Sequence, residues 1–331
     1  MSQELLILSR ADVCELLSLR ECIDAVERAF RLHAEGRTLA PGVLGVPATG
    51  GGGFHIKAAG LLDERSYFAA KTNANFPDNP RRFGRPTIQG TIMLADATNG
   101  TPLAIMESGS VTALRTGAAT AVAAKYLARG DARTATIVGC GVQGEVQLAA
   151  IAAVLPLERV RLFDLDPARA EILARRAEER HGLRAEAIRA LPGAIRVSDV
   201  CVTCTPARRA FVEANDVAPG SFIAAVGADS QGKQEIEPSL VVSSTLVVDV
   251  LQQCAEIGEL QHALAAGLLT REQVHAELGD VIVGRRPGRT RADEITMFDS
   301  TGTALQDVAA AIVVYEQARA TGRGMEVKLD G

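Results

Sequence analysis

The chain has 331 residues, of which 47% are hydrophobic, and its formal net charge at pH 7 is −5. This length exceeds what one hydrophobic core usually serves, so we expect two domains, and the apolar content is enough to bury a full core. The acidic balance argues against nucleic acid and anionic membranes as partners, because both need a basic protein surface.

The chain starts with a short apolar stretch that has no basic region before it, and no later apolar run reaches the length of a membrane span. We therefore expect neither a secretory signal nor a transmembrane helix, and a cytoplasmic protein. Residues 13–37 follow with apolar side chains at helical spacing. The Leu-Ser-Leu sequence within them predicts two short helices.

Residues 38–107 contain many prolines and the glycine run Gly50–Gly53, which separate short runs of β-forming residues. This pattern predicts an antiparallel β domain made of hairpins. Lys57 and Lys71 lie on two of these runs and would point the same way if the two strands pair. A lysine among apolar neighbours either extends its ammonium group to solvent or serves a buried anion.

An alanine-rich segment, residues 110–129, predicts a long helix with Ser110 as its N-cap. Arg115 lies in the second turn of this helix. A guanidinium group there can hold a substrate carboxylate or a cofactor phosphate with two hydrogen bonds, although a surface ion pair is the more usual role.

The run Thr134-Ala-Thr-Ile-Val-Gly139-Cys-Gly141-Val-Gln-Gly144 predicts a β-strand that leads through G-x-G-x-x-G into a helix at residues 143–153. The first glycine allows a tight turn, the second lets a diphosphate approach the backbone, and the third lets the helix pack closely on the strand. The free N–H groups at the start of that helix would then face the anion.

A second strand, residues 159–164, ends at Asp164, which stands 25 positions after Gly139. An acid near this position accepts hydrogen bonds from the adenosine ribose 2′-hydroxyl. The order of strand, glycine loop, helix, second strand and terminal acid predicts nucleotide binding. Because Asp164 would repel a 2′-phosphate, we expect NAD(H) rather than NADP(H).

Helix and strand then alternate, with a helix at residues 167–180 and strands at 197–205, 222–226 and 245–250. Alternation of this kind predicts an α/β fold with a doubly wound, mostly parallel sheet. The last helix, residues 303–321, is expected to be amphipathic and could return to pack on the first domain.

Cysteine and histidine spacing gives no support for a metal site. Cys201 and Cys204 have C-x-x-C spacing, but they lie on a predicted strand, where side chains three positions apart point to opposite faces. The five histidines lack any recognisable ligand spacing. We expect buried, structural cysteines.

Asp229 is the strongest catalytic candidate. It follows the predicted apolar strand at residues 222–226 and so lies beyond the carboxyl end of the sheet. Doubly wound proteins bind their ligands there. An acid there could relay a proton to or from an amine.

The run 227–233 matches most of a phosphate-binding P-loop, but Gln234 replaces the Ser or Thr that would hold Mg²⁺, which argues against that interpretation. The small polar loop 299–302 could close over a cofactor or be a plain turn.

These features together resemble the ornithine cyclodeaminase/μ-crystallin family, which includes archaeal-type alanine dehydrogenases and ketimine reductases. The likeness covers nearly the whole chain. It rests on Lys71 with Asn79 and Arg85-Pro-Thr-Ile-Gln-Gly90, on Leu103-Ala-Ile-Met-Glu-Ser and Thr112-Ala-Leu-Arg-Thr116, on Gly139-Cys-Gly-Val-Gln143, on Gly227-Ala-Asp-Ser-Gln-Gly-Lys233, and on Phe298-Asp-Ser-Thr-Gly302.

The resemblance implies an N-terminal α+β domain that binds substrate and dimerises, made of residues 1–115 and completed by 303–331, and a Rossmann-type NAD-binding domain over 116–302. It implies that Lys71 and Arg115 hold the substrate carboxylate, that Asp229 is the acid/base at the amino group, and that Lys57 and Thr301 also contact the substrate. The residues that it implies for the dinucleotide are Thr87, Arg115, Gly139, Gly141, Val142, Gln143, Asp164, Thr205, Val226, Lys233 and Ser300.

One departure bears on the activity. Ornithine cyclodeaminases carry an acidic segment before the catalytic lysine, whereas this chain has Gly53-Phe-His-Ile-Lys-Ala there. A positive or neutral pocket suits a substrate with a second carboxylate or a small side chain better than ornithine.

The resemblance therefore implies a homodimeric, NAD(H)-dependent oxidoreductase that transfers hydride at the α-carbon of an L-amino acid or its imine. Two alternatives stay open, namely ornithine cyclodeamination, in which NAD is recycled and ammonia released, and a non-catalytic binder of NAD(P)H or another ligand, similar to μ-crystallin. The oxidoreductase prediction depends on Lys71 and Asp229 converging beside the nicotinamide, across the crevice between the domains.

Overall fold

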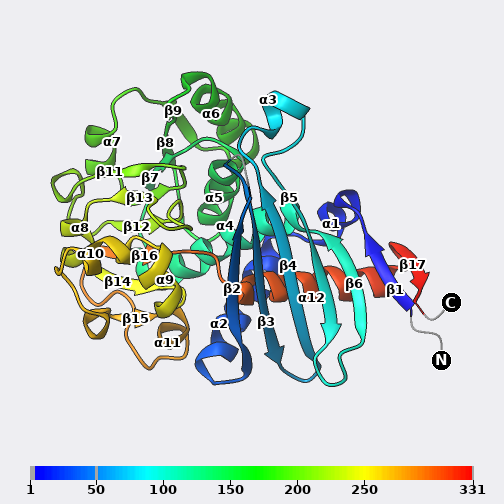
Figure 1. Ribbon diagram of the computed structural model, residues 1–331. Helices are drawn as coiled ribbons and strands as arrows, with labels where there is room; N and C mark the ends of the chain where they lie inside the picture. Colours follow the sequence, from blue (N-terminus) through cyan, green and yellow to red (C-terminus); the bar gives the residue numbers. More distant parts are fainter. Residues whose placement is uncertain (1–3, 49–50, 330–331) are drawn as a thin grey trace. The chain divides into compact units, whose positions relative to one another are not determined.

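The computed structural model describes residues 4–48 and 51–329. The chain divides into two compact units, whose elements are labelled in Figure 1. The first unit consists of Met1–Arg115 together with Thr303–Gly331, and the second is the continuous segment Thr116–Gly302. Two sequence predictions fall partly outside the described residues, since the chain start includes residues 1–3 and the glycine run includes Gly50.

The first unit is built on a mixed β-sheet, whose strand order within the described residues is β17-β1-β6-β5-β4-β3-β2. Strands β2 to β6 form an antiparallel meander, which confirms the predicted β domain. Their bounds are β2 (Thr38–Pro47), β3 (Gly53–Leu62), β4 (Ser66–Asn75), β5 (Ile88–Asp96) and β6 (Pro102–Glu107).

Two further strands extend this sheet. β1 (Glu4–Leu8) pairs parallel with β6, and β17 (Met325–Lys328) pairs antiparallel with β1. The sequence pattern predicts neither strand, because they are only five and four residues long and their pairing partners lie far away along the chain.

The N-terminal helices confirm the predicted break, with α1 (Arg10–Leu16) and α2 (Leu19–Ala34). Each begins with a capping box, in which a serine and an acid three residues later exchange hydrogen bonds with the backbone. The second helix has 16 residues and is longer than expected. A short helix, α3 (Asn79–Phe83), lies between β4 and β5.

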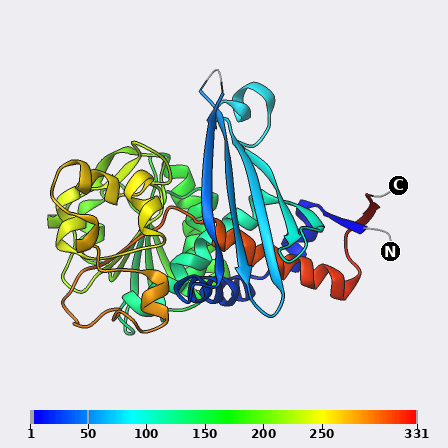
Figure 2. The same cartoon turned by 60° about the horizontal axis from the view of Figure 1, so that its bottom comes forward.

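The last helix, α12 (Ala304–Thr321), packs against α2 and against strands of this sheet. Figure 2 shows it lying across one face of the sheet. The helix does complete the first unit, but the prediction of an amphipathic helix is wrong for its first half, where residues 304–311 are all buried. Alanine and valine side chains are small enough to be enclosed on every side.

The second unit contains a parallel sheet, with the order β15-β14-β16-β12-β10-β7-β8-β9 among the described residues. Its strands are β7 (Thr134–Val138), β8 (Arg159–Phe163), β9 (Arg184–Ala187), β10 (Val200–Thr203), β12 (Phe222–Ala225), β14 (Thr245–Val248), β15 (Ala276–Glu277) and β16 (Thr296–Asp299). The strand order runs in one direction from β7 to β9 and in the other from β10 onward. This reversal confirms the predicted Rossmann-type, doubly wound fold.

Helices and a small additional ladder complete the second unit. The ladder pairs β11 (Arg208–Val212) in parallel with β13 (Gln234–Ile236). The helices are α5 (Val142–Ala152), α6 (Pro167–His181), α7 (Pro192–Arg196), α8 (Pro238–Ser243), α9 (Leu251–Ile257), α10 (Leu260–Ala265) and α11 (Leu278–Ile282), with 3₁₀ turns at Ala214–Asp216 and Arg271–Gln273. Within residues 4–48 and 51–329, no helix could cross a membrane.

Helix α4 (Ser108–Leu127) begins in the first unit and continues into the second at Thr116. The prediction that Ser110 is its N-cap is wrong, because the helix starts two residues earlier. The carboxylate of Glu107 accepts hydrogen bonds from the backbone N–H groups of Gly109 (2.6 Å) and Ser110 (2.9 Å). This acid satisfies the free amides at the helix start and complements the helix dipole.

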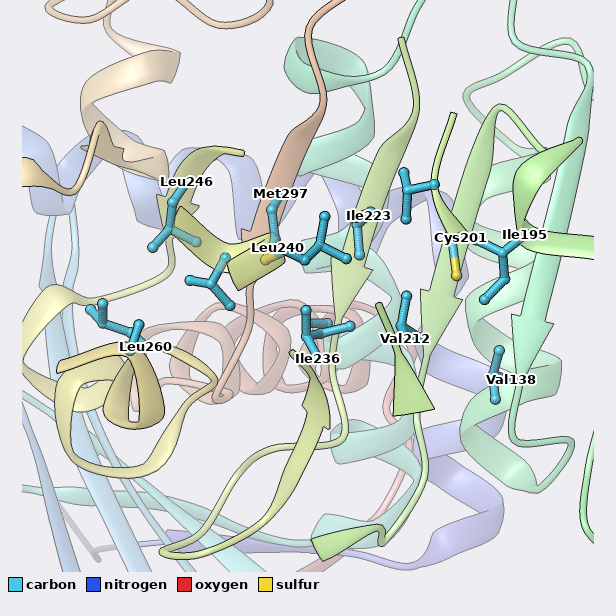
Figure 3. Close-up of a cluster of buried hydrophobic side chains, with 14 of the residues drawn as sticks. Val138, Ile195, Cys201, Val212, Ile223, Ile236, Leu240, Leu246, Leu260 and Met297 are labelled. Carbon is cyan, nitrogen blue, oxygen red and sulfur yellow. The ribbon is translucent and has the colours of Figure 1, made fainter. Parts of the chain in front are cut away.

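Figure 3 shows buried side chains that form a hydrophobic core in the second unit. Val138, Cys201, Ile223 and Met297 come from adjacent strands of the parallel sheet. Side chains from α7, α8, α10 and the β11–β13 ladder cover them, among them Ile195, Leu240, Leu260, Val212 and Ile236. This core holds the strands in register, so their carboxyl ends form one continuous edge.

Candidate active site

The glycine loop between β7 and α5 has the backbone that a diphosphate needs. Gly139 has a φ of +100°, and a Cβ there would lie 2.8 Å from the carbonyl oxygen of Cys204, so only glycine fits. A Cβ on Gly144 would collide with the carbonyl oxygen of Gly139. Gly141 faces open space and caps α5 without a side chain. The amides of Val142 and Gln143 at the helix start are therefore open to an anion.

Asp164 lies directly after β8, beside this loop. Its carboxylate accepts hydrogen bonds from the backbone N–H of Cys140 (2.8 Å) and of Asp166 (2.9 Å). The carboxylate is thus fixed at the carboxyl edge of the sheet, next to the glycine loop. Such a group can accept a hydrogen bond from a ribose hydroxyl and repels a phosphate.

The predicted cofactor residues of the later strands lie along the same edge. Thr205 follows β10, Val226 follows β12, and Ser300 and Thr301 follow β16. The hydroxyl of Thr301 donates to Asp249 (2.9 Å) and accepts from Gln253 (2.8 Å). Since β7, β10, β12 and β16 are consecutive neighbours in the sheet, their loops line one continuous edge.

Asp229 lies just beyond β12, as the sequence predicts, and its side chain is 53% exposed. Its carboxylate forms an ion pair with Lys233, with 2.5 Å between Oδ1 and Nζ. Lys233 is a predicted cofactor residue, and its backbone carbonyl also bonds to the ring of His262 (2.7 Å). An exposed carboxylate beside an ammonium group can exchange protons with a bound amine.

In the first unit, Lys71 on β4 is buried among charged partners. Its Nζ lies 2.7 Å from Oδ2 and 2.8 Å from Oδ1 of Asp307 on α12. Arg115 on α4 brings its Nε to 3.0 Å from the same Oδ1, and its Nη1 donates to Gln306 (2.7 Å). Lys57 on β3 is the direct cross-strand partner of Lys71, as predicted from the strand pattern.

Two cations, Lys71 and Arg115, share the carboxylate of Asp307 in this cluster. Burial lowers the pKa of Lys71 to about 7, and the charges of Arg115 and Lys57 act in the same direction, whereas Asp307 raises it. Burial also raises the pKa of Asp307, but Lys71 and Arg115 outweigh burial and hold that pKa below its usual value. The cluster is therefore suited to receive a further carboxylate.

Thr87, a predicted cofactor residue, also belongs to the first unit. It does not join the cluster around Lys71 and Asp307. It lies in the segment before β5, five residues ahead of Ile92, which is the β5 partner of Lys71. Its carbonyl oxygen accepts a hydrogen bond from the backbone of Phe76 (2.8 Å).

Asp307 and Gln306 are the site residues to which the sequence analysis gives no role. Asp307 belongs to the first turn of α12, where the helix dipole alone explains an acid. A carboxylate within a run of alanine and valine is the one signal that could have pointed to a buried partner. The side-chain Nε2 of Gln306 is buried and has no hydrogen-bond partner within the described residues.

Cys201 is buried, as predicted, whereas Cys204 is only half-buried, which the prediction of two buried cysteines has wrong. Cys201 is part of the hydrophobic core, and burial raises the pKa of its thiol to about 12. Cys204 lies beyond the strand, with its sulfur 3.3 Å from the carbonyl oxygen of Gly139. In the part of the chain that the structure describes, no group of three or more possible ligands could hold a metal ion.

Comparison with known sequences places this chain among well-defined relatives. The profile of the ornithine cyclodeaminase/mu-crystallin family matches residues 3–322. Alanine dehydrogenase of Archaeoglobus fulgidus is 39% identical over 325 residues, which cover 98% of each chain.

Solved structures agree with this match. An archaeal alanine dehydrogenase dimer with bound NAD superimposes with a TM-score of 0.94 at 39% identity, covering 98% of this chain and 99% of that one. The Thermococcus litoralis Δ1-pyrroline-2-carboxylate reductase, in complex with NADH and L-proline, gives 0.93 at 33% identity, with 97% and 100% covered. The iminosuccinate reductase of Paracoccus denitrificans, in complex with NAD⁺, gives 0.92 at 33%, with 98% and 100% covered.

Proposed function

We propose a function from the premise that this chain belongs to the ornithine cyclodeaminase/mu-crystallin family. It is an NAD-dependent oxidoreductase of the amino-acid dehydrogenase and imino-acid reductase type. The observation that carries the proposal is the buried, positively charged cluster of Lys71 and Arg115.

NAD(H), when bound, supplies or accepts the hydride that moves at the α-carbon of the substrate. The glycine loop and the start of α5, with Gly139, Gly141, Val142 and Gln143, hold its diphosphate. Asp164 binds the adenosine ribose and favours NAD(H) over NADP(H). The further residues that line the dinucleotide are Thr87, Arg115, Thr205, Val226, Lys233 and Ser300.

Lys71 and Arg115 bind the α-carboxylate of the substrate. Arginine offers a planar fork of donors and lysine a point charge, so together they fix both the position and the orientation of a carboxylate. Holding the α-carbon in place removes much of the entropic cost of hydride transfer. Asp229 gives or takes the proton at the substrate nitrogen, and Thr301 contacts the substrate.

The substrate is an L-amino acid, or its imine, with a small or acidic side chain. The charges of Arg115 and Lys57 both act on Lys71, so positive groups surround the position proposed for the carboxylate. Lys57 is the residue proposed to contact a second carboxylate. A distal ammonium group, as in ornithine, would meet charge of its own sign.

The protein works as a homodimer that joins through the free edge of β2. This strand ends the sheet of the first unit and exposes Leu39, Val43, Leu44 and Val46. An apolar edge strand is prone to pair with another chain unless it is covered. Light scattering of the purified protein should give twice the mass of one chain, and a monomer would contradict this assembly.

Steady-state assays of the purified protein with NADH test the proposed reaction. The panel consists of α-imino acids, and of α-keto acids with ammonia, that carry small or acidic side chains. NADH oxidation with at least one of them supports the proposal, and tight NADH binding without any oxidation counts against it. Ammonia release from ornithine without a net change in NADH absorbance would instead select cyclodeamination.

A further inference from the structure

Glu235 is a buried carboxylate of the second unit to which the proposed reaction gives no role. It lies on β13 and is fully buried. One oxygen accepts hydrogen bonds from the backbone N–H and the hydroxyl of Thr205, both at 2.7 Å. The other oxygen accepts from the backbone N–H of Gly227 at 2.8 Å.

Thr205 and Gly227 follow β10 and β12, which are neighbouring strands of the parallel sheet. Ligands of doubly wound proteins bind beyond these carboxyl ends. We propose that Glu235 is a positioning residue that fixes the ends of β10 and β12 in the geometry that binds the dinucleotide. This inference rests on the proposed function, because it takes NAD(H) to be the ligand at that edge.

Close packing leaves these strand ends little freedom. A Cβ on Gly227 would collide with the carboxyl carbon of Glu235 and with the carbonyl oxygen of Thr205. A Cβ on Gly139 would lie 2.8 Å from the carbonyl oxygen of Cys204, the residue before Thr205. The carboxylate of Glu235 is thus linked through Thr205 and Cys204 to the glycine loop.

Burial and hydrogen bonding act on the Glu235 carboxyl group in opposite directions. Burial raises the pKa of this carboxyl group, and the bonds from Thr205 and Gly227 oppose that rise. The three donors occupy three of the roughly four acceptor positions of its two oxygens. These bonds tie the ends of two neighbouring strands to one carboxyl group.

A second buried acid anchors the strand that carries Glu235. The carboxylate of Glu259 accepts from the backbone N–H groups of Glu235 (2.7 Å) and Ile236 (3.2 Å). Behind it, Asp299 at the end of β16 accepts from the backbone of Leu260 (3.0 Å). The backbone of β13 is therefore held by contacts separate from those to Thr205 and Gly227, which is what a support for a binding edge requires.

The test measures NADH affinity by fluorescence titration at a temperature well below every unfolding midpoint. Glu235→Gln keeps the shape but places an amide N–H₂ against one of the donors. We expect the Kd for NADH to rise about ten-fold or more in the folded variant. The matched control is Glu237→Gln, which alters a nearby acid that bonds to Ser239 near the start of α8, and it should change the Kd less than two-fold.

Thr205→Val, which removes one of the three bonds, provides a second test and should raise the Kd several-fold. Both substitutions act through one contact. The Kd of the double variant for NADH should therefore be about the same as that of Glu235→Gln alone, and not raised by the product of the two single effects. If Glu235→Gln does not fold, the Kd of Glu235→Asp decides, because the shorter side chain draws the carboxyl group away from Thr205 and Gly227, and an unchanged Kd in that folded variant would overturn the inference.

Unchanged NADH affinity in a folded Glu235→Gln variant would overturn the inference even if its unfolding midpoint falls, because a merely structural residue would lower only that midpoint. Multiplying effects in the double variant would overturn it too. Failure of the unaltered protein to bind NADH would overturn both the inference and the proposed function. Normal binding by every variant would overturn the inference alone.

Discussion

The ammonium group of Lys71 lies 2.7 Å from the carboxylate of Asp307, and both side chains are almost completely buried. The two residues are 236 positions apart along the chain. The same carboxylate lies 3.0 Å from the Nε of Arg115. One anion thus keeps two cations in place inside the first unit, and it leaves a positive charge for the substrate carboxylate to neutralise.

Asp307→Asn is expected to destabilise the protein strongly, because it leaves Lys71 and Arg115 buried without their anion. Removing one partner of a buried ion pair typically costs about 3–5 kcal/mol. Urea unfolding measures the change in the free energy of unfolding. The control is Glu326→Gln, which breaks the exposed ion pair with Arg319 and should cost at most about 1 kcal/mol. A loss for Asp307→Asn no larger than that of the control would contradict the role of Asp307.

The affinity for the substrate carboxylate is expected to fall as the pH rises through about 7. Burial lowers the pKa of Lys71 to about that value, so the group loses its proton and its charge above it. The pH profile of kcat/KM for the imino acid should show this ionisation.

Lys57→Gln should move that ionisation to higher pH. The charge of Lys57 lowers the pKa of Lys71, so its removal lets Lys71 keep its proton longer. If Lys57→Gln leaves the pH profile of kcat/KM unchanged, or shifts it to lower pH, the observed ionisation does not belong to Lys71.

The glycine loop was predictable because its requirements are local. A positive φ at Gly139 and the close approach of Gly144 concern neighbouring residues, and glycine is the residue type that satisfies them. The alternation of strands and helices was predictable for the same reason, since each element shows its own period.

The role of Asp307 as the buried partner of Lys71 and Arg115 was not predictable from local sequence. Its partners are on β4 and α4, and its place in the first turn of α12 has a sufficient local explanation. Ser110 failed as an N-cap because the helix begins earlier, where the side chain of Glu107 accepts from the amides of Gly109 and Ser110. Local patterns therefore predicted the elements, while the partners of buried charges depended on tertiary contacts.

Asp229→Asn is expected to abolish most turnover while leaving NADH binding nearly intact. The amide keeps the size of the side chain but cannot take up the proton, and loss of a general acid/base typically costs about 100-fold or more in rate. Single-turnover kinetics and NADH titration on the same preparation separate the two effects. A variant with near-normal turnover would remove Asp229 from the mechanism.

Asp164 should make the protein prefer NADH over NADPH, because its carboxylate beside the glycine loop would face the 2′-phosphate of NADPH. Asp164→Ser removes the negative charge but keeps a hydroxyl for the ribose. The ratio of the Kd values for NADPH and NADH should fall by about ten-fold, which corresponds to about 1.4 kcal/mol. Asp166→Asn, next in the same loop, is the control, because Asp166 uses its carboxylate to cap α6. Equal affinity of the unaltered protein for both dinucleotides would show that Asp164 does not face the ribose.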